Sequence, residues 1–334
     1  MITKHIFIVQ VSDFIGDDLM ITTITLNAAI DKVHYIERFR INSVNRVAEI
    51  AAEPGGKGNN VAKVARLLGS DVTASGFLGG DTGRFVDQQL RARGIASDPV
   101  WVTGQTREAF NIIDQSLGTQ TEILEPGPEI SAVEWQEMKV KVKDLAAKSS
   151  VISFSGSLPR GLQIHAYAEL IQAAKEAGAL TILDSSGESL RAAIESAPFL
   201  LKPNRDELAQ LTGQRADSAE SVIHMARTLI AQGISWVVVS LDKDGSLVVS
   251  ENQAWQVLPP VIDAVNTVGC GDALVGGTAN FLDLLGDKPA ASSMIEAVAW
   301  GTAAAASNAL YPIAGHVHAA GMQEMLRQVT VKPL

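Results

Sequence analysis

The stretch NTVGCGDALVGG occupies residues 266–277 and, of all segments, best indicates the fold and the chemistry. It places Gly269, Gly271 and Asp272 at the start of an apolar run with helical spacing. The first N–H groups of a helix lack intrahelical partners and carry partial positive charge, so this turn can bind an anion such as a phosphoryl group. A carboxylate beside that phosphate is a candidate to accept the proton of an attacking hydroxyl. The alternative is a simple N-cap, a position that aspartate favours.

The composition excludes several classes of protein. With 334 residues and 46% hydrophobic content, the chain can bury a large core in one large or two ordinary domains. Lys and Arg number 27 against 37 Asp and Glu, a formal net charge of −10, so neither nucleic acid nor an anionic membrane is an expected partner. Cys270 is the single cysteine, which excludes an intrachain disulfide and a multi-cysteine zinc site. We expect no structural metal.

No apolar run approaches the roughly 18 residues of a membrane span. Residues 1–19 contain an apolar stretch at 6–11, but they also carry three aspartates and no small-residue cleavage pattern. We therefore predict no signal peptide and a cytoplasmic location. Residues 1–19 are an N-terminal extension whose order the sequence leaves open: an extra edge strand, a leader without order, or a segment ahead of a true start at Met20.

Short apolar runs alternate with amphipathic segments, which predicts an α/β fold. The runs are continuous rather than alternating in polarity, as expected of strands buried on both faces of a parallel sheet. The segments between them space apolar residues at helical intervals. Such alternation predicts right-handed crossovers and a mainly parallel sheet covered on both faces. The expected strands are 21–26, 72–77, 151–154, 180–183, 199–201 and 236–240, and the expected helices are 60–68, 84–93, 132–147, 164–177 and 218–231.

Two stretches, residues 32–53 and 100–125, do not follow this order of buried strands and amphipathic helices. Both show strand-like alternation of polarity, with turns near Asn42 and Gly118. We predict that they form hairpins of a small sheet outside the main one. Such a sheet has an apolar face that needs cover, from a substrate or from a second subunit.

Several polar clusters follow the expected strands, where ligands bind in open parallel sheets. Asp31 follows the first strand and is a candidate to accept hydrogen bonds from two sugar hydroxyls, with a turn residue as the alternative. The segment GGKGNN at residues 55–60 precedes a helix. Gly56 indicates close approach of the backbone to a ligand, and Asn60 offers a polar side chain, although a structural turn stays open. The segment lacks the GxxxxGK[ST] pattern, so Lys57 is not a P-loop lysine.

Further candidates lie in the second irregular stretch and after later strands. The guanidinium of Arg107 suits a phosphorylated substrate, with a solvated surface arginine as the alternative. Ser157 is a candidate to contact substrate or to cap the next helix. Asn204 and Glu207 are three residues apart, so they share a helix face and either orient water around magnesium or form a capping box. Residues 242–245 are typical of a hairpin connection.

Taken in order, six motifs resemble those of the phosphofructokinase-B group of ribokinase-like carbohydrate kinases: NxAID, GGKGxN, TR, SGSLP, KPNxxE and NTVGxGD. The resemblance is strongest to 1-phosphofructokinase and tagatose-6-phosphate kinase, and it extends from about residue 21 to about residue 317. It implies a ribokinase-like three-layer α/β sandwich in residues 20–334, with the two irregular stretches as a small β-lid. It also implies a homodimer formed through the lid.

The resemblance implies roles for individual residues. Asp272 is the expected proton acceptor, and the backbone of Gly269, Cys270 and Gly271 is the expected anion hole. The expected substrate contacts are Asp31, Gly56, Asn60, Arg107 and Ser157, with Lys57 as a weaker candidate and with Arg46 reaching the site of a partner subunit. ATP and Mg²⁺ are the expected cofactors, with Asn204 and Glu207 at the Mg-ATP end and Ser240 and Gly245 at the nucleotide.

Three of the positions that depart from the family pattern bear on the chemistry. Cys270 stands where alanine or serine is common, and its place at a helix N-terminus predicts a thiol with a lowered pKa that is sensitive to oxidation. Asp242 replaces a common glycine, and aspartate tolerates a positive φ less well than glycine. Glu108 follows Arg107, where its charge would weaken anion binding.

The leading functional hypothesis is ATP-dependent phosphorylation of a ketohexose monophosphate, with fructose 1-phosphate first because that activity is the most widespread in this branch. Tagatose 6-phosphate is the alternative, since residues 121–125 and 157–162 look similar to segments of tagatose-phosphate kinases. A sugar-phosphate sensor without activity is the alternative of another class, and the presence of Asp272 with its flanking glycines argues against it. A dinucleotide oxidoreductase is disfavoured because no GxGxxG follows the first strand.

Overall fold

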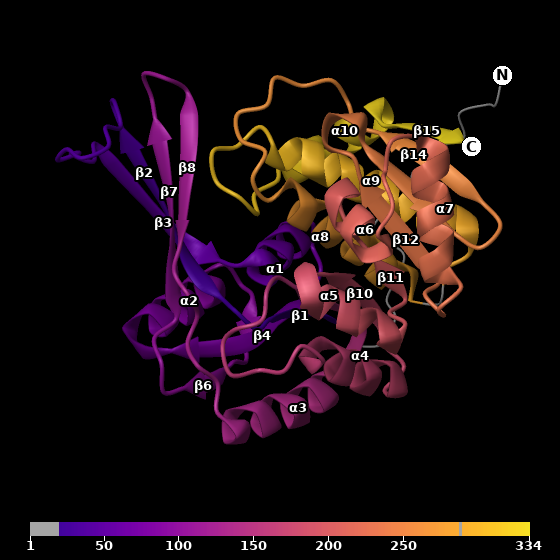
Figure 1. Ribbon diagram of the computed structural model, residues 1–334, viewed down its shortest axis with the longest axis horizontal. Helices are drawn as coiled ribbons and strands as arrows, with labels where there is room; N and C mark the ends of the chain where they lie inside the picture. The colour runs from indigo at the N-terminus through magenta and orange to yellow at the C-terminus, as the bar shows by residue number, and fades with distance from the viewer. Residues whose placement is uncertain (1–19, 287–288) are drawn as a thin grey trace.

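The computed structural model describes residues 20–286 and 289–334. Our expectation for residues 1–19 lies outside this part of the chain. The described chain forms a large sheet flanked by helices and a small sheet that projects from this body (Figure 1). Among its helices, none combines the length and the apolar character needed to cross a membrane.

The large sheet has eleven strands among the described residues, in the order β15-β14-β13-β12-β11-β10-β9-β1-β4-β5, with β6 also paired to β4. Neighbours from β12 to β5 are parallel, and β13, β14 and β15 extend the sheet as an antiparallel edge. The prediction of a mainly parallel α/β sheet is confirmed. The strands are β1 (Met20–Thr25), β4 (Val72–Gly79), β5 (Ala96–Ser97), β6 (Val100–Val102), β9 (Ser149–Ser155), β10 (Leu180–Asp184), β11 (Leu200–Leu201), β12 (Trp236–Ser240), β13 (Ser246–Val249), β14 (Ala254–Leu258) and β15 (Thr330–Pro333).

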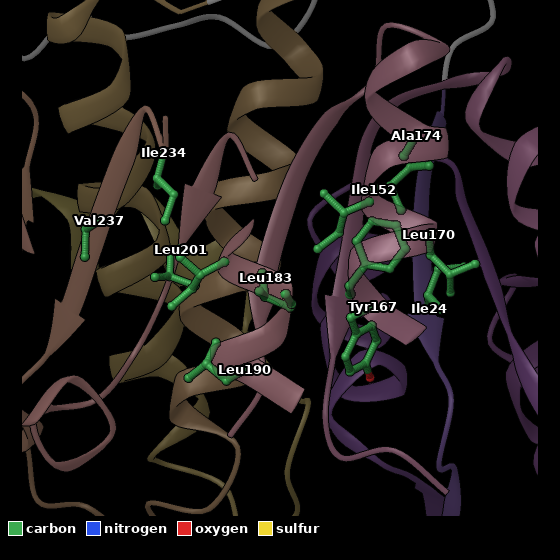
Figure 2. Close-up of a cluster of buried hydrophobic side chains, with 14 of the residues drawn as sticks. Ile24, Ile152, Tyr167, Leu170, Ala174, Leu183, Leu190, Leu201, Ile234 and Val237 are labelled. Carbon is green, nitrogen blue, oxygen red and sulfur yellow. The ribbon is translucent and has the colours of Figure 1, made fainter. Parts of the chain in front are cut away.

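Helices cover both faces of this sheet, as predicted. One core lies under α3 to α7, and part of it is drawn in Figure 2, where Tyr167 and Leu170 of α4 point toward Ile24 and Ile152 of the sheet. The second core lies under α1, α2, α8 and α9. The helices are α1 (Lys57–Leu67), α2 (Gly80–Ala92), α3 (Ala132–Ala146), α4 (Ala166–Glu176), α5 (Gly187–Ala193), α6 (Arg205–Thr212), α7 (Ala219–Ile230), α8 (Cys270–Leu285), α9 (Ala291–Asn308) and α10 (Met322–Gln328).

The ends of these helices follow from local sequence. Ser131 and Ser218 form capping boxes at the starts of α3 and α7, and Gly213 ends α6 in the left-handed conformation that glycine favours. Gly277 of α8 faces Gly301 of α9, where an added Cβ would lie 2.8 Å from the Gly301 Cα. These glycines let α8 and α9 pack closely, which fixes the start of α8 over the sheet edge.

The small sheet, which we call the lid, has the order β3-β2-β7-β8. It consists of two antiparallel hairpins joined by parallel pairing of β2 with β7. Its strands are β2 (Ala29–Ile36), β3 (Glu49–Gly55), β7 (Arg107–Asp114) and β8 (Thr119–Leu124). The second irregular stretch begins differently from our expectation, because residues 100–102 form β6 and pair with β4 of the large sheet. The lid strand starts only at Arg107.

Candidate active site

Asp272 lies in the first turn of α8 and is only 6% exposed. Its Oδ2 accepts a 2.8 Å hydrogen bond from Nδ2 of Asn60 on α1, so residues from two distant motifs meet here. Burial, together with the nearby carboxylate of Asp184, raises the pKa of Asp272 to about 7. A carboxylate with such a pKa is suited to accept a proton near neutral pH.

A buried ion-pair network lies beside Asp272. Asp184, at the end of β10, is paired with Nζ of Lys57 at 2.9 Å and with Nζ of Lys202 at 3.3 Å. Burial alone would raise the pKa of Asp184, but the two ammonium groups hold that pKa below its usual value. The pKa of Lys57 is raised despite burial, mainly by Asp184. Two lysines with one shared carboxylate leave net positive charge next to Asp272, which favours an anion there.

The predicted anion-hole turn contains a glycine in the left-handed conformation. Gly269 caps α8 with φ 79°, in the left-handed region where glycine is favoured. A Cβ added at Gly271 would lie 3.6 Å from Nζ of Lys202, so this ammonium faces the start of the helix. The N–H of Cys270 donates a long 3.3 Å bond to the Thr267 carbonyl, so this member of the predicted anion hole is partly engaged.

The expectation of an acidified thiol at Cys270 is wrong. Its side chain is half-buried, and burial raises the pKa of the thiol. The hydrogen bond from Asn308 and the helix terminus do not offset this loss of hydration. Cys270 therefore stays a thiol at neutral pH and is less reactive than the sequence suggested.

A cavity of about 650 Å³ lies at this edge of the sheet. It is lined by the predicted nucleotide residues Ser240 and Gly245, and it reaches Cys270 and Gly271 at the start of α8. Asp242 also lines it and has φ 53°, so the aspartate adopts the left-handed conformation that a glycine would take without strain. Residues 242–244 form a 3₁₀ turn between the antiparallel strands β12 and β13, which confirms the predicted hairpin connection.

Asn204 and Glu207 form a capping box at the start of α6. The Glu207 N–H donates to Oδ1 of Asn204 at 2.8 Å, and the Asn204 N–H donates to Oε2 of Glu207 at 2.8 Å. Of the two roles that the sequence left open, the structure therefore displays the cap. Glu207 nevertheless lies close enough to raise the pKa of Lys57, so its carboxylate belongs to the surroundings of the ion-pair network.

Another cavity, of about 100 Å³, lies between the lid and the loop after α9. We call it the acceptor cavity. Asp31, Lys63, Asn111 and Glu122 contribute polar side chains to its wall. Burial raises the pKa of Asp31 and lowers that of Lys63, and each charge partly compensates the other. Gly55 is required beneath Asp31, because an added Cβ would lie 2.1 Å from the Asp31 carboxyl group.

Arg107 lies near Asp31, and the hydrogen bonds that it makes within residues 20–286 and 289–334 are long, at 3.3–3.4 Å, to the carbonyls of Asn27 and Glu125. Its guanidinium can therefore exchange these bonds for stronger ones to an anion. Glu108, which we expected to weaken anion binding at Arg107, faces away from it. Adjacent strand residues face opposite sides, and Glu108 pairs with Nζ of Lys32 at 2.7 Å on the other face of the lid.

The remaining candidates are placed as follows. Gly56 caps α1 with φ 93°, and an added Cβ would lie 2.8 Å from Cγ2 of Thr25. Ser157 is exposed after β9, and its Oγ accepts a 3.1 Å hydrogen bond from Nδ2 of Asn27. Arg46 is exposed on the loop between β2 and β3 and lines neither cavity. Of these candidates, Asn60 contacts Asp272 directly, Asp31 lines the cavity beside residues 266 and 268, and Arg107 lies near Asp31.

Comparisons with known proteins agree with this geometry. Residues 20–316 match the family described as pfkB family carbohydrate kinase. The chain belongs to this family. It is 36% identical over 315 residues to a tagatose-6-phosphate kinase of Staphylococcus epidermidis, covering 93% of this chain and 99% of that protein. As a carbohydrate kinase, the chain is a phosphotransferase with an alcohol group as acceptor.

Solved structures give the same fold. Phosphofructokinase-2 from Escherichia coli in complex with potassium superposes with a TM-score of 0.86 at 29% identity, covering 92% of this chain and 98% of that one. A possible 1-phosphofructokinase from Thermotoga maritima gives 0.84 at 27% identity, covering 94% and 99%. The ribokinase-like architecture expected from the motifs is confirmed.

Asp184 and Lys202 were missed as functional candidates. Lys202 opens the KPNxxE motif and Asp184 follows a predicted strand, but their pairing depends on the neighbouring positions of β10 and β11 in the sheet. A signal was nevertheless present. Both residues lie where a predicted strand ends, which is the rule that identified Asp31.

Proposed function

We propose that the chain transfers the γ-phosphoryl group of ATP to a hydroxyl of a ketohexose monophosphate. The observation that carries this proposal is that the 650 Å³ cavity and the acceptor cavity approach the same turn. Thr267, Cys270 and Gly271 line the first cavity, and Asn266 and Val268 line the second. Two bound molecules would therefore meet at the start of α8, beside Asp272.

In this proposal each group has a chemical task. Asp31 and Asn60 orient the acceptor hydroxyls, and Arg107 binds the phosphate already on the sugar. Asp272 takes the proton of the attacking hydroxyl. The N–H groups at the start of α8 and the ammonium of Lys202 stabilise the negative charge of the transferred group. Most of the rate enhancement comes from positioning and electrostatics, because phosphoryl transfer requires little covalent assistance.

Magnesium would enter with the nucleotide and neutralise phosphate charge. Glu207 is the carboxylate that fits this role by position, since Asp184 is held by two lysines. One Glu207 oxygen accepts the Asn204 N–H, and the other would bind a water of the hydrated ion. This donor set suits an ion held mainly by phosphates and water rather than by a protein cage.

Among acceptors, we propose tagatose 6-phosphate first and fructose 1-phosphate second. The sequence alone placed fructose 1-phosphate first. The similarity to tagatose-6-phosphate kinases over nearly the whole chain supports the reverse order.

We also propose a homodimer formed through the lid. The face opposite Asp31 and Arg107 carries Ile50, 59% exposed, and Ile123, 51% exposed. The loop from β2 to β3 adds Ile41 and Val44, which are 89% and 85% exposed. Apolar side chains exposed together on one face favour association of two copies. A second copy bound there would bring its Arg46 toward the site.

The test is coupled ADP release with tagatose 6-phosphate, fructose 1-phosphate and fructose 6-phosphate in parallel. The proposal predicts the highest kcat/KM for tagatose 6-phosphate. A higher value for fructose 1-phosphate would reverse the order of acceptors. ADP release that no phosphosugar stimulates would contradict the kinase assignment and favour a sensor.

A further inference from the structure

Asn308, the last residue of α9, is fully buried and joins two segments of backbone. Its Nδ2 donates a 3.0 Å hydrogen bond to the carbonyl of Val268. Its Oδ1 accepts hydrogen bonds from the N–H groups of Gly315 at 2.8 Å and His316 at 3.3 Å. One side chain thus connects the anion-hole turn to the loop after α9.

The bond to Val268 has a geometric consequence for the next residue. The Val268 carbonyl and the Gly269 N–H belong to one planar trans peptide and point in opposite directions. Holding the carbonyl toward Asn308 therefore holds the Gly269 N–H away from it. Gly269 has φ 79° and no side chain, so rotation of this peptide meets little resistance from Gly269 itself. The hydrogen bond from Asn308 to the Val268 carbonyl therefore fixes the direction of this peptide.

The loop that Asn308 holds also forms cavity wall. Pro312, Ile313 and Ala314 line the acceptor cavity. The same loop touches the turn directly, since an added Cβ at Gly269 would lie 2.6 Å from the Cβ of Ala314. Nδ2 of Asn266 donates to the Pro312 carbonyl at 2.8 Å, which ties the two segments together a second time. The acceptor wall and the anion-hole turn therefore form one connected unit.

We propose that Asn308 is a positioning residue for phosphoryl transfer, which fixes the peptide between Val268 and Gly269 so that the anion hole is formed before the substrates bind. This inference rests on the proposed function of the α8 terminus. Asn308 itself lines neither cavity. Its loss should lower kcat and leave the KM for ATP nearly unchanged, because the hole acts on charge that develops in the transition state.

The kinetic test compares Asn308→Ala and the milder Asn308→Ser with Ser307→Ala. Ser307 is the matched control, since it is also buried and its Oγ accepts a 2.9 Å hydrogen bond from the His318 N–H, beyond both cavity walls. We expect kcat to fall at least about 10-fold in both Asn308 variants, with the KM for ATP within about 3-fold, and to stay within about 2-fold in Ser307→Ala. Equal kcat losses at 307 and 308, or losses confined to KM, would overturn the proposal.

A second readout does not depend on activity. Hydrogen–deuterium exchange of the peptide covering residues 266–272, measured on folded protein by mass spectrometry, should be faster in both Asn308 variants than in the wild type and unchanged in Ser307→Ala. Unchanged exchange in the Asn308 variants would overturn the proposal. If the wild type turns over no phosphosugar, the proposed function fails, while the exchange result still decides whether Asn308 fixes the turn.

Discussion

The protonation state of Asp272 controls the proposed reaction, because only the carboxylate can accept a proton. Burial and Asp184 raise its pKa to about 7. We therefore predict that kcat/KM falls about tenfold per pH unit well below pH 7 and reaches a plateau above it. A pH–rate profile with saturating ATP measures this. A profile that stays flat down to pH 5 would rule out a base with a raised pKa.

Replacing Asp272 by asparagine separates catalysis from stability. The Asp272→Asn variant keeps an oxygen to accept the Asn60 hydrogen bond, but it should lose about 100-fold to 10,000-fold in kcat. The pKa in the folded protein lies above the unfolded value, so the stability linked to this group is lost as pH rises through about 7. The variant should therefore unfold at higher denaturant concentration than the wild type at pH 8.

The exposed Asp206→Asn change is the control for both effects. It should leave kcat and the denaturation midpoint unchanged. An Asp272→Asn variant with near-native kcat would show that the base lies elsewhere.

Asp242 provides a test of backbone strain. It has φ 53°, which costs an L-residue free energy that glycine does not lose. We predict that Asp242→Gly raises the free energy of unfolding by about 1 kcal/mol, measured by denaturant titration. Asp244→Gly, two residues away and without positive φ, should bring no gain. Equal changes in the free energy of unfolding for Asp242→Gly and Asp244→Gly would contradict backbone strain at Asp242.

At the scale of elements, the alternation of side chains along a strand explains why the charge of Glu108 does not face the same side of the lid as Arg107. Arg107 and Glu108 are neighbours in sequence but lie on opposite faces of β7, and counting alternate residues along the strand could have predicted this. The pKa of Cys270 could not have been predicted in the same way. It depends on whether burial outweighs the helix terminus, and the sequence does not contain the depth of the thiol.

The exposed apolar face of the lid is the feature from which we predict a homodimer. We expect Ile50→Lys combined with Ile123→Lys to shift the protein from dimer to monomer, because two charges would be desolvated in the interface. Sedimentation velocity measures the change. Val133→Lys on α3, where the side chain is 77% exposed, is the control and should leave the mass unchanged. A wild-type monomer at micromolar concentration would contradict lid association.

At the scale of the whole molecule, the sequence predicted the parallel core and placed the candidate site residues at one edge of the sheet because both predictions depend on one rule. Strands end and helices begin at the same edge of a parallel sheet, so motifs far apart meet there, as Asn60 and Asp272 do across 212 residues. This rule does not predict the antiparallel edge of the sheet, where β15 at the C-terminus pairs with β14. It also does not specify which charges pair, so the Lys57–Asp184–Lys202 network emerged only from the structure.

The central claim is that a nucleotide and a sugar phosphate meet at Asp272 and exchange a phosphoryl group. Phosphorus NMR of the reaction with ATP and tagatose 6-phosphate tests it most directly. The account predicts one new phosphate ester on the sugar for each ADP formed, and loss of this product in Asp272→Asn. ADP accompanied by inorganic phosphate, with the sugar unchanged, would contradict the account.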